Sequence, residues 1–209
     1  MRPGSLKRIR IVGIGDSTTA GTPGFLSPLE APPRGAGDER SQYAHWMAVT
    51  HGGWEVLNRG VNGERSDQIL ARFGRDAVLE DPRLVVILCG VNDVYQGFQP
   101  KFTQGNLARM YSLALEAKVT PVACSILPYN TSGQRETKTI RELNDWIARV
   151  SKKLSIPFSD TNRAVASPDR PDRLAGSPDG LHPDIEGYRR MGLAISMSIE
   201  GYLLAEAGR

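Results

Sequence analysis

The run Leu84-Val85-Val86-Ile87-Leu88-Cys89 is the most apolar stretch of this 209-residue chain. A short apolar run without alternation is typical of a strand that is buried on both faces of a parallel sheet. The glycine and polar residues of Gly90-Val91-Asn92-Asp93 end the run at once. We therefore expect this strand to lie at the centre of a parallel sheet whose two faces are covered by helices.

Strand-like and helix-like runs alternate on both sides of this stretch. Dense β-branched or apolar residues predict strands at residues 8–14 and 54–58 before it, and at residues 121–126 and 156–158 after it, the last at an edge. Between them, apolar residues recur at helical spacing: Tyr43, Trp46, Met47 and Thr50; Ile69, Leu70, Phe73 and Ala77; Leu107, Met110, Tyr111 and Ala114; Ile140, Leu143, Ile147, Val150 and Leu154; Ile185, Tyr188, Ile195, Ile199 and Tyr202. This alternation predicts an α/β fold, a three-layer α/β/α arrangement with a five-stranded parallel sheet, in a single domain over residues 1–209.

Local signals predict where some of these elements begin. Asp38 and Ser66 are suited to cap the helices that follow them, and Pro183 is suited to be the first residue of the last helix. Residues 21–37 are rich in proline and glycine, and residues 163–177 are rich in proline and aspartate. Both segments are predicted to be loops.

Charge and composition argue against several classes of function. The formal net charge of +3 comes from lysines and arginines that are spread along the chain, which is not the pattern of a nucleic-acid-binding protein. The basic residues 1–10 are not followed by an apolar segment, and no stretch approaches the length of a membrane span. The histidines, His45, His51 and His182, lack zinc-type spacing, so we expect no metal and no cofactor.

The two cysteines bear on the compartment of the protein. Cys89 and Cys124 each lie in an apolar run that reads as a buried strand, and we expect free thiols that act as small apolar side chains. Free thiols suit a reducing compartment, so a cytoplasmic protein is expected. The alternative is an exported protein whose signal peptide has been removed.

The expected sheet predicts where a ligand would bind. In open parallel sheets the ligand crevice lies outside the carboxyl ends of the strands. The loops after the first, second, third and fifth predicted strands therefore converge on one rim. They carry Ser17, Gly63, Asn92 and the turn from Asp179 to His182.

The turn Ser177-Pro178-Asp179-Gly180-Leu181-His182-Pro183 sets a carboxylate three residues before an imidazole. Pro183 disfavours helical geometry at His182, and Gly180 lets the chain bend back. Asp179 can then reach the near ring nitrogen of His182 and leave the far nitrogen free to accept a proton from a nucleophile. The alternative is a helix cap without catalytic function.

The other three residues also have two interpretations each. Ser17 lies between a strand and a helix, where backbone N–H groups favour negative charge, and it is either a nucleophile or an N-cap. Gly63 either offers its N–H to a substrate oxygen or supplies a positive φ. Asn92 either donates its amide to an oxyanion or forms an Asx-turn. Acyl transfer needs a nucleophile, a base, a base-orienting group and oxyanion donors, and all of these meet on the predicted rim.

Two motifs of other protein families match this sequence only in part. Thr19 stands where the Gly-x-Ser-x-Gly elbow of α/β-hydrolases has its second glycine, so the catalytic geometry of that fold cannot be assumed for this chain. The run Gly13-Ile14-Gly15 suggests a dinucleotide or phosphate loop, but the third glycine of that motif is absent.

Four motifs together resemble the ordered sequence blocks of the SGNH hydrolases, or GDSL esterase/lipase family. They are Gly15-Asp16-Ser17, Asn58-x-Gly60-x-x-Gly63, Gly90-x-Asn92-Asp93 and Asp179-x-x-His182, and they span nearly the whole chain. The resemblance implies a flavodoxin-like sheet, Ser17 as nucleophile, His182 as base and Asp179 as its orienting group. It further implies an oxyanion hole made by the Ser17 N–H, the Gly63 N–H and the Asn92 side chain.

The chain departs from the family pattern in two places. Thr18 follows Ser17 where the family name expects leucine, and the loop at residues 21–37 is long for the smallest members. The loop bears on substrate choice.

The expected function is a serine esterase that acts on a small-molecule ester. It would hydrolyse short-chain carboxylic esters through an acyl-enzyme on Ser17, with carbohydrate O-acetyl esters as one candidate class. Longer-chain lipase, lysophospholipase, thioesterase or acyltransferase activity is an alternative on the same site. An alternative of another class is a non-catalytic ligand-binding module on the same fold. The feature against this alternative is that none of the predicted catalytic positions is replaced.

Overall fold

The computed structural model describes residues 8–208 and contains a five-stranded parallel sheet in the order β4-β1-β5-β6-β7. The strands are β1 (Ile9–Gly15), β4 (Trp54–Gly60), β5 (Leu84–Leu88), β6 (Thr120–Cys124) and β7 (Phe158–Ser159). Each pairs in parallel with its neighbours, and β5 is the middle strand. Counted along the chain, the order is 2-1-3-4-5, as in flavodoxin. The prediction of a central strand at residues 84–89 is confirmed.

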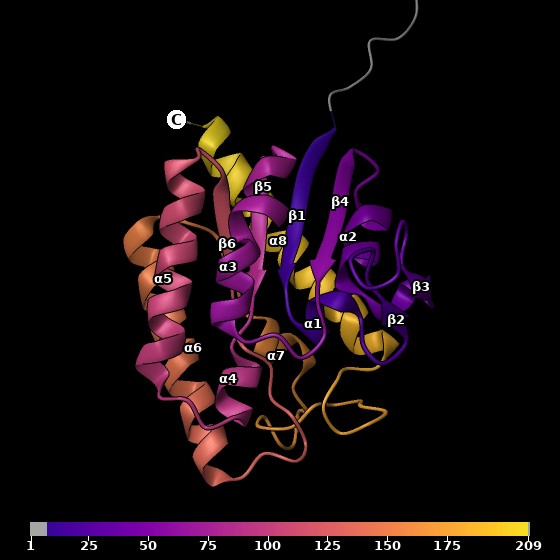
Figure 1. Ribbon diagram of the computed structural model, residues 1–209, viewed down its shortest axis with the longest axis vertical. Coiled ribbons are helices and arrows are strands. Elements are labelled where there is room, and N and C mark those ends of the chain that lie inside the picture. The colour runs from indigo at the N-terminus through magenta and orange to yellow at the C-terminus, as the bar shows by residue number, and fades with distance from the viewer. Residues whose placement is uncertain (1–7, 209) are drawn as a thin grey trace, which may run out of the picture.

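Helices cover both faces of this sheet, as Figure 1 shows, with α3 and α5 in front of it and α8 behind. The long helices on the front face are α3 (Ser66–Asp76), α5 (Pro100–Glu116) and α6 (Gln134–Leu154), and those on the back face are α2 (Tyr43–Thr50) and α8 (Ile185–Ala207). The short elements are α1 (Ser17–Ala20), α4 (Val91–Tyr95), α7 (Thr161–Val165), β2 (Phe25–Leu26), β3 (Ala36–Gly37) and the 3₁₀ helices η1 (Glu39–Ser41) and η2 (Val78–Glu80). The predicted three-layer α/β/α fold is therefore confirmed.

The central strand supplies both halves of the core. Val85 and Ile87 pack with α3, α5 and α6, whereas Leu84, Val86 and Leu88 pack with α2 and α8. All five residues are buried because both faces of the strand meet helices. This two-sided burial explains why the run has no polar alternation.

The segment at residues 21–37 is more ordered than the predicted loop, since β2 and β3 form a small antiparallel hairpin in it. A Cβ at Gly37 would lie 2.3 Å from the backbone oxygen of Gly24, and Gly37 has a φ of +114°. Only glycine permits so close an approach at such a backbone angle. The glycines that indicated a loop therefore allow two strands to pair.

Three predicted helix starts are corrected. Asp38 caps the 3₁₀ helix η1 rather than α2, because its carboxylate accepts from the Arg40 N–H at 3.0 Å. Ser66 is the first residue of α3 and not its cap. The last helix begins at Ile185 and not at Pro183, because the Asp184 carboxylate accepts from the Gly187 N–H at 2.7 Å and so occupies the N-cap position.

Strand ends differ from the predictions by one or two residues. β6 begins at Thr120 and ends at Cys124, and β7 comprises Phe158 and Ser159. Cys89 and Cys124 are both buried and unpaired with each other. Within residues 8–208, no helix combines the length and apolarity that crossing a membrane requires. Most of the basic N-terminal stretch, residues 1–7, lies outside the described part of the chain.

Candidate active site

A single cavity of about 230 Å³ at the carboxyl ends of the strands is lined by four of the residues predicted to lie on the rim, Ser17, Gly63, Asn92 and His182. Ser17 begins α1 directly after β1, Gly63 follows β4, and Asn92 lies in α4 after β5. His182 comes from the turn before α8. The full lining is Ser17, Thr18, Asn62, Gly63, Val91, Asn92, Tyr95, Tyr129, Leu181 and His182.

The imidazole of His182 bridges a hydroxyl and a carboxylate. Its Nε2 lies 2.9 Å from Ser17 Oγ, and its Nδ1 lies 2.7 Å from Asp179 Oδ2. The other oxygen, Asp179 Oδ1, accepts from the backbone N–H groups of Leu181 at 2.9 Å and His182 at 2.8 Å. Gly180 has a φ of +78°, which closes this turn. The Asp179 carboxylate is thus held in place by the turn that it belongs to.

The hydrogen bonds of Asp179 determine its ionisation and the tautomer of His182. Burial alone would raise the pKa of Asp179, but hydrogen bonds from the His182 ring and from the two backbone N–H groups lower this pKa to about 2. An ionised carboxylate can only accept a hydrogen bond, so His182 Nδ1 carries the proton. Neutral His182 then presents an unprotonated Nε2 to the Ser17 hydroxyl.

Two other aspartates of this region have different partners. Asp184 caps α8, and Asp172 lies 3.3 Å from the guanidinium of Arg173. Within residues 8–208, Asp179 is the carboxylate that contacts His182.

Ser17 is placed by a tight connection between β1 and α1. Asp16 is the N-cap, and its carboxylate accepts from the Thr18 N–H at 3.0 Å, so the interpretation of Ser17 as the cap is wrong. A Cβ on Gly15 would lie 2.1 Å from the backbone oxygen of Leu88. The glycine lets β1 end against β5, which directs Ser17 into the cavity.

Two backbone N–H groups and one amide are placed to receive negative charge. Within the described chain, the N–H groups of Ser17 and Gly63 have no intramolecular acceptor. Asn92 Nδ2 donates to the backbone oxygen of Glu64 at 2.9 Å, which turns the amide toward the Gly63 loop and leaves its second N–H for a ligand. Gly63 has a φ of +73°, so both interpretations of this glycine apply. Asn92 lies in α4 and its amide bonds to a distant residue, not within a local Asx-turn.

The site depends on a buried carboxylate whose role the sequence did not predict. Asp93 is fully buried and accepts from the Ser66 N–H at 2.9 Å, from the Ser66 hydroxyl and from Thr103 Oγ1 at 3.1 Å. These bonds attach α4 to α3 and α5 and so hold Asn92. The position of Asp93 directly after Asn92 was the available signal.

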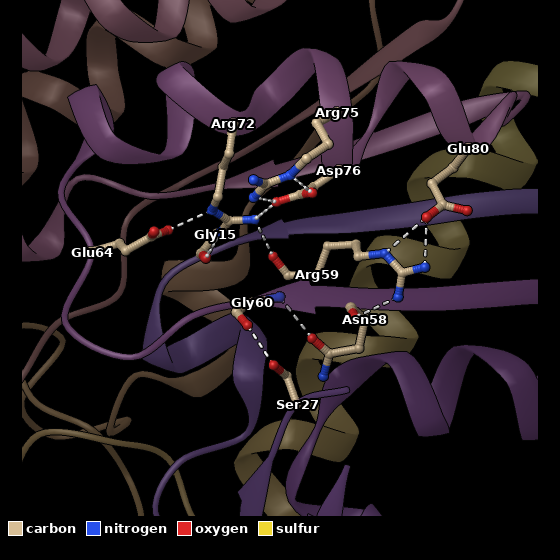
Figure 2. Close-up of polar contacts among 10 residues, drawn as sticks. All are labelled: Gly15, Ser27, Asn58, Arg59, Gly60, Glu64, Arg72, Arg75, Asp76 and Glu80. Carbon is tan, nitrogen blue, oxygen red and sulfur yellow. Dashed lines mark hydrogen bonds and ion pairs between the residues drawn. The ribbon is translucent and has the colours of Figure 1, made fainter. Parts of the chain in front are cut away.

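The loop that leads from β4 to Gly63 also contacts the hairpin segment. Glu30 Oε1 accepts from the Asn62 N–H at 2.8 Å, and Ser27 Oγ donates to the Gly60 backbone oxygen at 2.6 Å, a contact drawn in Figure 2. The long segment at residues 21–37 therefore supports the chain just before Gly63.

Comparisons with known proteins find similar sequences and a similar fold. The sequence model of the GDSL-like Lipase/Acylhydrolase family matches residues 14–190. The chain is 30% identical over 154 residues to "Thioesterase 1/protease 1/lysophospholipase L1" of Escherichia coli, which covers 71% of each protein. It is 27% identical to an arylesterase of Vibrio mimicus, over 85% of this chain and 81% of that one. A solved lipolytic protein of the G-D-S-L family from Desulfitobacterium hafniense superposes with a TM-score of 0.76 at 26% identity, over 91% of this chain and 99% of that chain.

Proposed function

Because the chain belongs to the GDSL-like lipase/acylhydrolase family and is a carboxylic ester hydrolase, we propose that it hydrolyses short-chain esters through an acyl-enzyme on Ser17. The observation that carries this proposal is the 2.9 Å contact between His182 Nε2 and Ser17 Oγ. A hydroxyl this close to an unprotonated imidazole can be activated as a nucleophile.

The proposed reaction has two halves. His182 Nε2 takes the proton of Ser17 as Oγ attacks the ester carbonyl carbon, and the ionised Asp179 stabilises the imidazolium that forms. The oxyanion is received by the N–H groups of Ser17 and Gly63 and by the Asn92 amide. The tetrahedral intermediate collapses, the alcohol leaves with the proton from His182, and the acyl group stays on Ser17. Water then attacks the acyl carbon as His182 takes its proton, the bond from that carbon to Ser17 Oγ breaks to release the carboxylic acid, and His182 returns the proton to Ser17 Oγ.

The size and lining of the cavity support a small substrate. Its volume of about 230 Å³ is below the roughly 300–1,000 Å³ that is usual for sites of drug-sized ligands. Val91, Tyr95, Tyr129 and Leu181 give it an apolar wall suited to a short acyl group. Short-chain carboxylic esters, including O-acetylated carbohydrates, are therefore the proposed substrates.

A second candidate is longer-chain ester or thioester hydrolysis. It is favoured by the relative from Escherichia coli, whose name includes thioesterase and lysophospholipase. Rates on p-nitrophenyl esters of increasing chain length, on an acetylated sugar and on an acyl-CoA would separate the two candidates.

The central test is Ser17→Ala. We expect this variant to lose ester hydrolysis while keeping its fold, because only a hydroxyl is removed and the N-cap of α1 is Asp16. Ser198→Ala is the matched control, since the Ser198 hydroxyl bonds the Ala194 backbone oxygen within α8. Turnover of Ser17→Ala at the wild-type rate would end the proposal.

A further inference from the structure

Behind the proposed oxyanion hole lies a buried guanidinium that the reaction itself does not use. Arg72, on α3, is the one arginine or lysine among the buried residues of the described chain, and its side chain is 8% exposed. Figure 2 shows its guanidinium between the end of β1, the end of β4 and the loop that follows β4. A charge in such a place must be compensated by its neighbours.

The guanidinium joins segments that are far apart in the sequence. Arg72 Nη2 donates to the Gly15 backbone oxygen at 3.0 Å, and Nη1 donates to the Arg59 backbone oxygen at 2.9 Å. Nε donates to Glu64 Oε2 at 2.7 Å. Gly15 stands two residues before Ser17, and Glu64 directly follows Gly63.

The contact with Glu64 also reaches the third donor. The Glu64 side chain pairs with Arg72 while its backbone oxygen accepts from Asn92 Nδ2 at 2.9 Å. One side chain is thus connected, within one or two residues, to each of the three proposed oxyanion donors.

We propose that Arg72 is a positioning residue that sets the spacing of these donors by holding the ends of β1 and β4 and the Glu64 loop together. The inference rests on the proposed function, since it concerns the same reaction. Oxyanion donors act only at hydrogen-bond distance from the charge that develops, so a displacement of the loop by about 1 Å is costly. The planar fork of arginine can make these divergent bonds at once, whereas lysine offers a single ammonium.

The neighbouring Arg75 provides a matched control. Both arginines are on α3 and both contact Asp76, Arg72 at 3.3 Å and Arg75 at 2.6 Å. The Arg75 side chain, however, is 73% exposed, and in Figure 2 it reaches Asp76 but not the β1 end or Glu64. A role in pairing with Asp76 alone would give the two substitutions similar effects.

The test compares Arg72→Met, Arg72→Lys and Arg75→Met in the full-length protein on one short-chain p-nitrophenyl ester. The active fraction is counted by labelling Ser17 to completion with a fluorophosphonate, and kcat is expressed per labelled site. We expect Arg72→Met to lower kcat on the order of 10²-fold with KM nearly unchanged, Arg72→Lys to be intermediate, and Arg75→Met to match wild type. When Arg72→Met is combined with Asn92→Ala, kcat should fall by less than the product of the two single decreases, because both substitutions affect stabilisation of the same oxyanion.

The outcomes separate this inference from the proposed function. If the wild-type protein does not hydrolyse the ester, or if Ser17→Ala hydrolyses it equally fast, the proposed function itself is wrong. If the wild-type protein is active, an unchanged kcat per labelled site in Arg72→Met overturns the inference. The inference is also overturned if the double variant with Asn92→Ala loses kcat by the full product of the two single decreases. If Arg72→Met does not fold, Glu64→Gln serves instead, because it weakens the contact between Arg72 and the loop. A wild-type kcat in both Glu64→Gln and Arg72→Lys would then overturn the inference.

Discussion

At the scale of single residues, the orientation of His182 depends on one carboxylate. Asp179 Oδ2 contacts the ring while Oδ1 is fixed by two backbone N–H groups of the same turn. The carboxylate can therefore aim the imidazole without support from elsewhere. Its pKa, lowered to about 2, keeps it charged at every pH where the protein would be assayed.

We predict that Asp179→Asn lowers kcat by on the order of 10³- to 10⁴-fold, because an amide in this place permits the wrong tautomer of His182. The comparison variants are Asp169→Asn, Asp172→Asn and Asp184→Asn, measured on one short-chain ester with folding checked by circular dichroism. Asp184→Asn should retain activity because asparagine is an equally good N-cap. If Asp179→Asn keeps most of its activity while one of the other three variants loses it, the aspartate of that variant orients His182 instead.

At the scale of elements, the short helix α1 is capped by a carboxylate in an unfavourable environment. Burial raises the pKa of Asp16 to about 7, hydrogen bonds from Thr18 oppose this rise, and the charges of Asp93 and Glu64 add to it. Between about pH 4 and 7, folded Asp16 thus holds a proton that the unfolded chain has released. By linkage, this group makes the free energy of unfolding fall as pH rises through that window.

We predict that Asp16→Asn removes this dependence and, at pH 7.5, has the higher free energy of unfolding, by on the order of a few kcal/mol. Asparagine keeps the cap and carries no charge. Urea unfolding at pH 5, 6 and 7.5 measures the slope for both proteins. Asp38→Asn is the control. Hydrogen bonds from Arg40 lower the pKa of Asp38 to about 2, so the contribution of Asp38 to the free energy of unfolding changes with pH only below about pH 4, and this variant should keep the wild-type slope. An equal slope in wild type and Asp16→Asn would contradict the assignment.

At the scale of the whole molecule, one sheet joins two cores. Ile87 of β5 belongs to the core under α3, α5 and α6, and Met191 of α8 belongs to the core on the other face. Neither side chain has exposed surface. Because β5 contributes side chains to both cores, the loss of one should loosen the other.

We predict that Ile87→Ala and Met191→Ala each lower the free energy of unfolding by about 2–5 kcal/mol within one cooperative transition. Circular dichroism and loss of ester hydrolysis should then give coincident midpoints in urea. Leu79→Ala, at a side chain 79% exposed, should unfold like wild type. Two separate transitions would contradict the expectation of a single domain.

The sequence determined the features that depend on neighbouring residues or on periodic burial. The central strand at residues 84–88 was evident from its apolar run, and the helices were evident from their spacing. Once the strands were assigned, parallel topology placed Ser17, Gly63, Asn92 and His182 on one rim. The contact between Asp179 and His182 lies within one turn, so local sequence was enough to predict it.

Only the tertiary structure decided which polar side chains are buried and what they bind. Arg72 lies on a helix, where an arginine usually indicates a solvated face, yet its partners include the backbone oxygen of Gly15, 57 residues away. Asp93 and Glu64 are likewise defined by bonds to distant segments. Periodicity reports which face of an element is apolar, whereas the partners of a buried charge come from other elements and are known only when the chain has folded.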